Sequence, residues 1–458
     1  MTPDSAYRTA MASLAWPAFP APWAANKLAL LFQIEQNQWR APEQIAASQF
    51  DQLRKLLTFA AATVPHYRRW LGGNFRAEEL TPQNWGKIPV LTRQQAHQGP
   101  AELVSDRIPK EHGKTFTQKT SGSTGMVVEV LGTDLTDLYW QVFCLRDHLW
   151  HRRDLREKLC VIRFQRDNPV KASAGMAAAG WGPATDDVVI TGPSASYDIL
   201  LEIGHIAGRL MLDRPGYLLS HPSMIHGLAT HCLEKGISLP GLKEVRTLGE
   251  SAHESLRERC REAWGVPVVD MYTCQEAGYL ALQCPEQENY HVQAENILLE
   301  VVDDHGRACA PGEIGRVLVT SLNNFATPLI RYELGDYAEV GATCSCGRGL
   351  PVLKRIMGRY RNLLTLPDGT RHWALIGYPS DIAPIEQMQM VQTGLDEIKV
   401  RLVMPRLLGD GETRALTAFI HDTLGYPFRL RFEYVDTIRN SANGKVEQVI
   451  SLINPLPA

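Results

Sequence analysis

The chain has 458 residues, of which 44% are hydrophobic and 21% are charged, a composition typical of globular proteins. This composition excludes a disordered chain, a collagen, a coiled coil and a small disulfide scaffold. The 47 basic and 50 acidic residues leave a net charge of −3, which gives no electrostatic reason to expect a nucleic acid partner. At about 150 residues per domain, the length predicts material for about three domains.

The apolar stretches are far shorter than the roughly 20 residues that span a bilayer, so we expect no membrane span. Three prolines, at positions 17, 20 and 22, interrupt the apolar run near the N-terminus, which argues against a secretory signal. The expectation is therefore a cytoplasmic enzyme or binding protein, either a monomer or a homodimer. Its nine cysteines are expected to be reduced thiols by default.

The first two thirds of the chain alternate between helical and strand-like patterns. Apolar spacing predicts a helix over 48–71 with Ser48 as its cap, then a short strand over 88–91 before Thr92, which would cap the next helix. Further strands are expected at 127–131, 159–164, 188–190 and 245–248, and helices at 135–150 and 199–210. This alternation predicts an α/β fold with mainly parallel sheets.

After residue 290 the pattern becomes β-rich, with short strands expected at 297–303, 315–321, 337–340 and 353–357. Beyond Gly358 the chain has an α+β pattern of its own. It consists of strands at 363–366, 398–404 and 430–435 and a helix at 412–424. We therefore expect a large domain of several subdomains over residues 1–357 and a small domain over residues 358–458.

The most distinctive local motif is the run Thr120, Ser121, Gly122, Ser123, Thr124 and Gly125. Its glycines allow a close backbone approach, and its hydroxyl and N–H groups can donate to phosphate oxygens. Met126 stands where a Walker A lysine would stand, so this is not a P-loop of that type. A solvated loop remains the alternative interpretation.

Two further motifs follow predicted strands. The motif Tyr272–Glu276 comes after a short strand expected at 268–271, where the carboxylate of Glu276 can hold Mg²⁺ and the ring of Tyr272 can face a base. The turn Gly249, Glu250 and Ser251 follows the strand at 245–248. A strand end with one exposed glutamate is the alternative for the first motif.

Three more residues occupy turns or boundaries. Asp336, behind Gly335, could accept hydrogen bonds from a ribose diol, or it could be an ordinary turn residue. Gly358 and Arg359 lie at the expected domain boundary, as a hinge or as a plain basic linker. Lys445 follows Gly444 in a turn, where a lysine is usually just solvated.

In this order and at these spacings, the motifs resemble those of the adenylate-forming acid ligase superfamily over residues 85–450. Within it, the chain looks most like the branch of phenylacetate–CoA ligases and coenzyme F390 synthetase-like proteins. The segments that carry this likeness are Pro65–Arg68, Ile88–Thr92, Cys284–Glu286, Pro328–Tyr332 and Cys344–Arg348.

The resemblance implies a role for each motif. Residues Thr120–Gly125 would bind the triphosphate of ATP, and Glu276 would hold Mg²⁺. The base and ribose would be bound by Gly249, Glu250, Ser251, Tyr272, Gln275, Asp336 and Arg359. Lys445 would serve adenylation, and the C-terminal domain would rotate about Arg361 after that step.

The resemblance also gives three cysteines a role. Cys284, His291, Cys344 and Cys346 form a C-x₆-H and C-x-C set that suits a closed, structural Zn²⁺ site. Unrelated buried cysteines and a surface histidine are the alternative. A closed set has no open coordination position, so we expect no catalytic role for this metal.

The chain departs from the family pattern at several positions. Thr273 stands where relatives usually have glycine, and Gln275 where they have threonine or serine. Met126 replaces the lysine that commonly follows the triphosphate loop, and Arg361 replaces the usual hinge Asp or Lys. The Glu, the ribose Asp and the C-terminal Lys are kept, so activity is still expected.

The implied function is ATP-dependent activation of a carboxylic acid to an acyl-adenylate, followed by transfer to coenzyme A. An aryl or arylacetic acid is expected because the segment that supplies the acyl pocket is aromatic, although such residues are also ordinary core. They are Trp140, Phe143, His148, Phe164, Trp181 and Tyr197. The alternatives are an enzyme that transfers the acyl group to an amine or a carrier protein, an enzyme that transfers AMP to a cofactor, and a catalytically silent nucleotide-binding relative.

Overall fold

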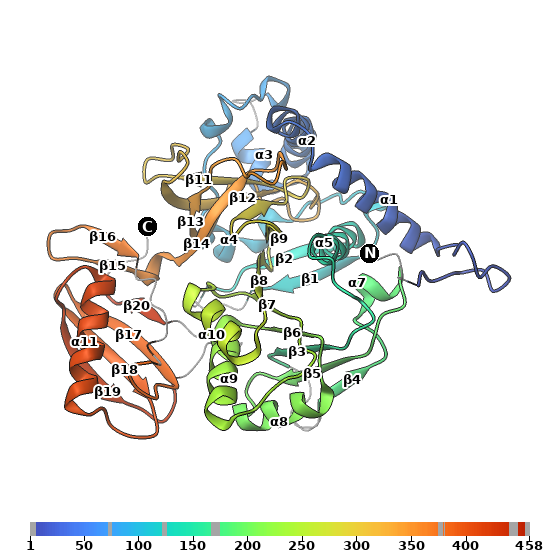
Figure 1. Cartoon of the computed structure of the whole chain (residues 1–458). Coiled ribbons are helices and arrows are strands. Elements are labelled where there is room, and N and C mark those ends of the chain that lie inside the picture. Colours follow the sequence, from blue (N-terminus) through green and yellow to red (C-terminus); the bar gives the residue numbers. More distant parts are fainter. Residues whose placement is uncertain are drawn as a thin grey trace. The chain divides into compact units, whose positions relative to one another are not determined.

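The computed structural model describes residues 6–71, 76–120, 126–165, 175–373, 379, 381–438 and 448–453, without the side chains of residues 70, 71 and 361. The chain divides into two compact units (Figure 1). The first comprises residues 1–157, 178–193 and 271–356. The second comprises residues 158–177, 194–270 and 357–458.

The first unit begins with three helices, each of which has a proline at its start. They are α1 (Pro22–Asn37), α2 (Pro42–Thr63) and α3 (Pro65–Leu71). A proline suits this position because its fixed φ matches the helix and its missing N–H is not needed there. The helix expected over 48–71 therefore begins earlier, at Pro42, and breaks at Val64, which is extended (φ −108°, ψ 118°) because Pro65 follows it.

A β-hairpin and a long helix follow in the first unit. Strands β1 (Thr115–Lys119) and β2 (Glu129–Thr133) are antiparallel and enclose the Ser/Thr/Gly motif. The side chain of Thr133 caps α5 (Asp134–Trp150) by accepting a hydrogen bond from the N–H of Thr136. The strand expected at 188–190 is wrong, because this segment follows α7 (Pro183–Asp186) and makes only an isolated bridge between Val189 and Tyr7.

The rest of the first unit is largely a sheet, with the strand order β11-β12-β13-β14-β10-β9-β8. Its strands are β8 (Val268–Cys274), β9 (Gly278–Gln283), β10 (Tyr290–Val292), β11 (Ile297–Val302), β12 (Ile314–Ser321), β13 (Tyr332–Val340) and β14 (Val352–Arg359). The pairings β8–β9, β9–β10, β10–β14, β11–β12 and β12–β13 are antiparallel. This is the β-rich portion that the sequence predicts.

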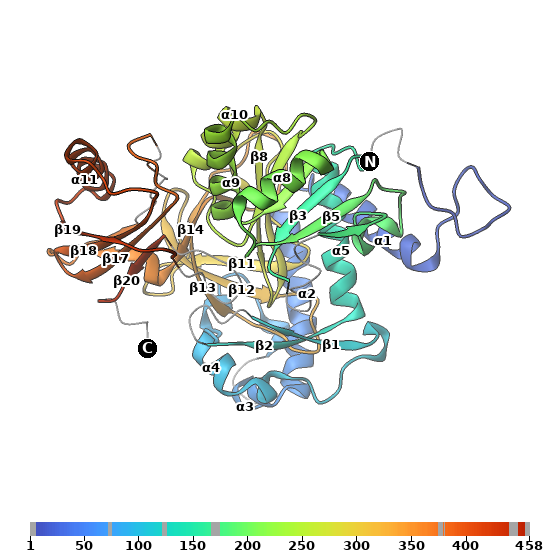
Figure 2. The same cartoon turned by 90° about the horizontal axis from the view of Figure 1, so that it is seen from below.

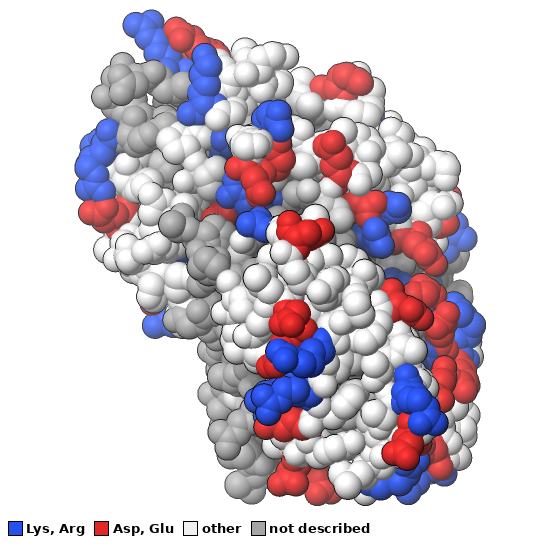
Figure 3. Space-filling view, turned by 90° about the vertical axis from the view of Figure 1, so that its left-hand side faces the viewer, with Lys and Arg blue, Asp and Glu red and all other residues white. Residues whose placement is uncertain are grey.

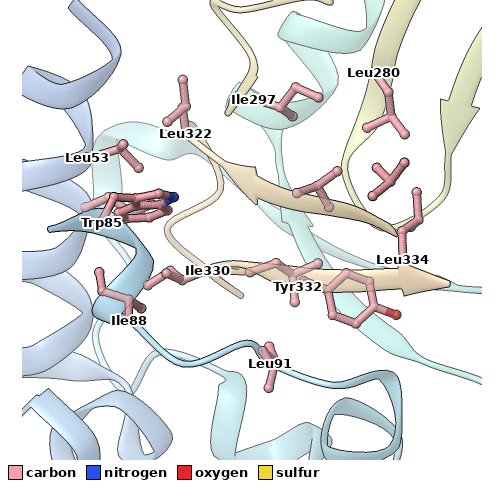
Figure 4. Packing of buried hydrophobic residues seen from close by; sticks show 14 of the residues in the cluster. Leu53, Trp85, Ile88, Leu91, Leu280, Ile297, Leu322, Ile330, Tyr332 and Leu334 are labelled. Carbon is pink, nitrogen blue, oxygen red and sulfur yellow. The ribbon is translucent and has the colours of Figure 1, made fainter. Parts of the chain in front are cut away.

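A hydrophobic core packs the N-terminal helices against this sheet. Leu53 of α2 and Trp85 lie beside Leu322 and Ile330, as Figure 4 shows. The same core extends to Tyr332, whose ring is fully buried. Residues on both sides of the core are thereby fixed relative to β13, the strand that carries Asp336.

The second unit contains the parallel sheet that the alternating pattern predicts, in the order β7-β6-β3-β5. The strands are β3 (Leu159–Arg163), β5 (Ser194–Asp198), β6 (Tyr217–Ser220) and β7 (Glu244–Leu248), and β4 (Met176–Ala178) lies between β3 and β5 in the chain. The helices are α8 (Ile203–Asp213), α9 (Pro222–Lys235) and α10 (Glu254–Trp264). Buried apolar residues of strands and helices form one core.

The C-terminal residues of the second unit form a sheet of their own, in the order β19-β18-β17-β20. These strands are β17 (Gln387–Gly394), β18 (Glu397–Val403), β19 (Arg429–Tyr434) and β20 (Val449–Ser451), preceded by the pair β15 (Leu363–Thr365) and β16 (Arg371–Trp373). Helix α11 (Asp410–Leu424) lies along one face of the sheet (Figure 2), and its buried Leu416, Ile420 and Leu424 join the core there. This is the small α+β part that the sequence predicts.

Charged side chains of both signs mix on the surface. Basic and acidic residues are interspersed on the face that Figure 3 shows, in keeping with the small net charge. Within the described part of the chain, no helix combines the length and apolarity needed to cross a membrane.

Candidate functional site

The Ser/Thr/Gly motif lies in the loop of the β1–β2 hairpin, and Thr120 closes that loop. The N–H of Thr120 donates to the carbonyl of Val128 at 3.0 Å, and the N–H of Val128 donates back to Thr120 Oγ1 at 2.9 Å. This reciprocal pair fixes the base of the loop. Residues Ser121, Gly122, Ser123, Thr124 and Gly125, which the sequence predicts to bind triphosphate, lie outside the described residues.

Glu276 lies in the turn between β8 and β9 and forms a buried ion pair with Arg93. Arg93 Nη1 is 3.0 Å from Glu276 Oε1, and the two side chains are 9% and 5% exposed. The same Nη1 donates to the hydroxyl of Tyr332 at 3.2 Å. Glu276 is therefore an inward-facing carboxylate with a cationic partner, not an exposed strand-end residue.

Arg93 also reaches the loop of the hairpin. Its Nη2 is 3.2 Å from Thr120 Oγ1 and 3.4 Å from the carbonyl oxygen of Met126. These two residues flank the segment 121–125 on either side. One guanidinium therefore joins both ends of the Ser/Thr/Gly loop to the carboxylate of Glu276.

Local backbone structure determines where Arg93 lies. Leu91 pairs with Tyr332 in a parallel bridge, through the Leu91 N–H to the Arg331 carbonyl and the Glu333 N–H to the Leu91 carbonyl. Thr92 then caps the short helix α4 (Arg93–Gln98), accepting from the N–H of Gln95. The strand expected at 88–91 is thus reduced to a single bridge at Leu91, but the expected cap at Thr92 is confirmed.

Asp336 lies inside β13, not after a turn. Arg316 of β12 pairs with Tyr337, and Leu318 pairs with Glu333, so Leu334, Gly335 and Asp336 all face one residue of β12. Gly335 has φ +86°, which glycine adopts without strain. The resulting bulge re-aims Asp336, whose Oδ2 accepts a 2.9 Å hydrogen bond from the hydroxyl of Tyr272.

The surroundings of Glu276 are mostly withdrawn from water. Burial acts to lower the pKa of Arg93, but Tyr332, Glu276 and Asp336 outweigh it, so this pKa lies above its ordinary value. Burial also raises the pKa of Cys274 well above its ordinary value, so this thiol stays protonated. Gln275, by contrast, is exposed. These residues provide a fixed positive charge beside carboxylates and a protonated thiol.

The predicted residues of the second unit form a separate group. Gly249 follows β7 with φ +80°, a conformation that favours glycine. The carboxylate of Glu250 accepts from the N–H and the hydroxyl of Ser223 at 2.9 and 3.1 Å, and so satisfies a donor at the start of α9. A Cβ on Gly358 would lie 3.6 Å from the hydroxyl of Ser251, so these two predicted residues are neighbours.

The predicted hinge lies at the end of β14. The N–H of Arg359 donates to Asn362 Oδ1 at 2.7 Å, and Asn362 Nδ2 donates to the carbonyl of Val449 in β20 at 2.6 Å. Arg361 lies between them in a short 3₁₀ turn, and its side chain is not described. Lys445 lies outside the described residues.

Four side chains form a cluster that fits a tetrahedral metal. The ligand atoms of Cys284, His291, Cys344 and Cys346 all lie within 4.8 Å of one another. Cys284 Sγ is 3.9 Å from Cys344 Sγ, and Cys346 Sγ is 3.3 Å from His291 Nε2. Ligands about 2.3 Å (S) and 2.0 Å (N) from a tetrahedral Zn²⁺ are separated by about 3.5–3.8 Å, so the arrangement suits this ion.

The sheet brings these four residues together. Cys284 directly follows β9, and His291 lies in β10, which pairs with β9. On its other side β10 pairs with β14, so the loop before β14, which carries Cys344 and Cys346, returns to the same place. Burial, together with Arg348 and Arg146, lowers the pKa of His291 to about 4, which keeps the imidazole neutral as a metal ligand must be.

Sequence analysis missed two residues of the candidate site, Arg93 and Tyr332. Both belong to or adjoin segments that carry the family resemblance, Ile88–Thr92 and Pro328–Tyr332. That proximity was the available signal. Their partners, Thr120 and Glu276, are distant in the chain, so only the folded arrangement shows what the two residues contact.

Comparison with known families gives one match, and comparison with known proteins gives one match over most of the chain and one over about a third of it. The family described as the CapK C-terminal domain matches residues 379–452. Protein CapK of Staphylococcus aureus is 21% identical over 401 residues, and this match covers 83% of each chain. Phenylacetate-coenzyme A ligase of Thermus thermophilus is 31% identical over 160 residues, which are 33% of this chain and only 36% of that ligase.

A solved structure shares the fold. 2-Hydroxyisobutyryl-CoA ligase, in the postadenylation state in complex with R3-HIB-AMP, superposes with a TM-score of 0.70 over 91% of each chain, at 17% sequence identity. The expected fold class, an α/β protein with a large sheet and a small C-terminal α+β part, is therefore confirmed. The expected boundary at 357/358 stays a prediction.

Proposed function

Since the chain belongs to the adenylate-forming acid ligase superfamily, we propose that it uses ATP to convert a carboxylic acid into an acyl-adenylate. The acyl group then passes to coenzyme A as a thioester. The proposal is supported by one sequence relative and one structural neighbour, both of which are CoA ligases. It covers the whole chain, although the ligase of Thermus thermophilus matches only part of it.

One observation carries the proposal: residues predicted separately from distant motifs form two hydrogen-bonded groups in the first unit, Thr120 with Glu276 through Arg93 and Tyr272 with Asp336, and the charges of Glu276 and Asp336 both act on Arg93. Arg93 joins Thr120 to Glu276, and Tyr272 binds Asp336. Unrelated strand ends would not be expected to converge in this way. The group contains a hydroxyl, a cation and two carboxylates, the chemistry that a metal–nucleotide requires.

Each residue group has a task in the reaction. The acid is a poor electrophile, so its oxygen attacks the α-phosphate of ATP and displaces pyrophosphate. The loop 120–125 would hold the leaving pyrophosphate, Asp336 would bind the ribose diol, and Lys445 would offset charge that develops on the phosphoryl oxygens. Glu276 would hold Mg²⁺, which would supply positive charge to offset the charge of the phosphates.

We assign an aryl or arylacetic acid as substrate, because one relative is a phenylacetate ligase and because of the position of Trp140. Trp140 packs against Tyr279 with ring centroids 4.8 Å apart. A Cβ on Gly278 would lie 3.4 Å from its ring. Trp140, Phe164 and Trp181 are half-buried, whereas Phe143 and Tyr197 are fully buried core residues. We choose Trp140 among the half-buried three because Gly278 and Tyr279, which it contacts, follow the turn that carries Glu276.

We further propose that the Cys284, His291, Cys344 and Cys346 cluster binds a structural Zn²⁺. The mutual distances support this proposal. Four protein ligands would leave no open position, so the ion would pin the loop before β14 to the β9–β10 hairpin and take no part in the chemistry.

A two-step assay tests the proposed reaction. The protein is incubated with ATP, Mg²⁺ and a panel of aliphatic, aryl and arylacetic acids, and pyrophosphate release is measured. Release with an aryl or arylacetic acid is expected, and coenzyme A should then yield the thioester by mass spectrometry. No acid-dependent release would refute the enzyme, whereas release without a thioester would indicate transfer to an amine or carrier protein.

A further inference from the structure

Met126 follows the Ser/Thr/Gly loop, at a position where the family resemblance implies a lysine. ATP carries about four negative charges, and the described site adds the carboxylates of Glu276 and Asp336. Charges of the same sign in a buried site repel strongly, so a polyphosphate needs a compensating cation there.

Arg93 lies where such a cation is needed. Its Nη2 contacts Thr120 Oγ1 and the carbonyl of Met126, the residues that flank the loop on either side. Its Nη1 contacts Glu276 Oε1. The Nε of Arg93 is buried and makes no hydrogen bond within the described residues, so this side chain keeps a donor unused.

Stability alone does not account for the Arg93–Glu276 pair. A buried ion pair often contributes nothing net, because taking both charges out of water costs as much as their attraction returns. The contacts of Arg93 are also not spread over a general core. Besides the Tyr332 hydroxyl and the Leu334 carbonyl of β13, they reach Glu276, Thr120 and Met126, the carboxylate and the loop ends that the proposed reaction uses.

We propose that Arg93 binds the polyphosphate of ATP in this chain and so takes the place of the lysine that is absent at position 126, where this chain has Met126. This inference rests on the proposed adenylation. In the absence of nucleotide the guanidinium neutralises Glu276. When the metal ion and the nucleotide bind, Glu276 becomes available to the metal ion. The planar guanidinium of Arg93 then donates hydrogen bonds to phosphate oxygens. Arg93 is thus the cation shared between carboxylate and phosphate.

The test measures binding by calorimetry, so it does not depend on knowing the acid. Pyrophosphate, ATP and AMP are titrated into wild type and Arg93→Met, each with and without Mg²⁺. Loss of a charged phosphate contact should weaken pyrophosphate and ATP about 10- to 100-fold. AMP lacks the β- and γ-phosphates, so its affinity should change less than about threefold.

A compensating variant separates a phosphate contact from a merely structural role. Arg93→Met with Met126→Lys returns a cation to the loop, and pyrophosphate affinity should recover to within about threefold of wild type. Arg316→Met is the matched control, because Arg316 also pairs with a glutamate, Glu333 at 2.7 Å, but within the described residues it makes no ion pair or hydrogen bond with Thr120, Met126 or Glu276. Its ligand affinities should equal those of wild type.

The outcomes are distinct. Unchanged pyrophosphate affinity in Arg93→Met, or equal loss of AMP and pyrophosphate without rescue by Met126→Lys, overturns the inference and leaves the proposed function standing. A wild type that binds no ATP overturns both. If Arg93→Met does not fold, Arg93→Lys replaces it. Lysine cannot form the planar fork, so severalfold weaker pyrophosphate binding is expected, and unchanged binding would again overturn the inference.

Discussion

The hydroxyl of Tyr272 donates a 2.9 Å hydrogen bond to Oδ2 of Asp336, although 64 residues separate the two in the chain. The bond connects β8 with the bulge of β13, where Gly335 turns the strand. The proposed ribose ligand is therefore oriented by the residue that the sequence assigns to the base.

Removing this hydroxyl should weaken nucleotide binding. Tyr272→Phe is expected to weaken AMP binding about fivefold, as measured by calorimetry, because a typical hydrogen bond contributes about 1 kcal/mol and this one acts on the nucleotide only through Asp336. Asp336→Ala should weaken it more. Tyr67→Phe is the matched control, because the buried hydroxyl of Tyr67 bonds, among the described residues, only backbone groups: it donates to the carbonyl of Pro328 and accepts from the N–H of Ile330. Equal AMP affinity in Tyr272→Phe and wild type would contradict the orienting role.

Lys445 should serve only the first half-reaction. Lys445→Ala is expected to lower adenylation at least 100-fold, because charge on the α-phosphate is no longer offset. Thioester formation from a supplied acyl-adenylate should stay within about threefold. Lys399→Ala, on β18 of the same C-terminal part, is the control and should affect neither step. Equal losses in both half-reactions would refute this division of labour.

The cysteine cluster should hold one zinc ion per chain. Elemental analysis is expected to find about one zinc in wild type and none in Cys344→Ser, which should also unfold at a lower temperature because the loop before β14 loses its anchor. Cys309→Ser is the control, since Cys309 lies outside the cluster and should leave the zinc content unchanged. A stable wild type that contains no metal would disprove the site.

Trp140 should determine the preference for an aromatic acid. Trp140→Ala is expected to raise KM for an aryl acid about 3- to 10-fold, the range of one lost aromatic contact, without changing KM for ATP. Trp140→Phe, which keeps an aromatic face, should lie between this variant and wild type. An unchanged KM for the aryl acid in Trp140→Ala would place the acid elsewhere.

His226 should make the protein less stable in acid. Burial, with help from Arg259, lowers the pKa of His226 to about 3, against 6.5 as its ordinary value. Between these values the unfolded chain binds more protons than the folded one, so stability is complete above pH 6.5 and falls as the pH drops toward 3. The free energy of unfolding should therefore fall by about 2 kcal/mol through His226 when the pH is lowered from 7 to 5.

The variant His226→Leu isolates this contribution. Urea unfolding of wild type and variant at pH 7 and pH 5 measures it as a difference of differences, which cancels the effects of other titrating groups. The pH-dependent loss should be smaller in the variant by about 2 kcal/mol. The same loss in both proteins would show that His226 is not held neutral.

Local patterns in the sequence were good predictors of the elements that those patterns control. The expected helix over 135–150 matches α5, and the expected strand over 245–248 matches β7, because side-chain periodicity and capping act over a few residues. The strand expected at Val188–Ile190 was wrong: its apolar run has β propensity, yet among the described residues it pairs only through the bridge of Val189 with Tyr7.

The same distinction between local pattern and tertiary contact holds for the residues of the candidate site. From the sequence alone came the residue types and spacing that mark Glu276, Asp336 and the cysteine cluster, since a resemblance is carried by linear motifs. Arg93 could not be found that way, because its meaning lies in the distances to Thr120 and Glu276, which the pairing of Leu91 with β13 creates. The net charge of −3 is likewise only a sum over the composition and gives no sign of the buried pair of Arg93 and Glu276. Only the tertiary structure brings these two charges together.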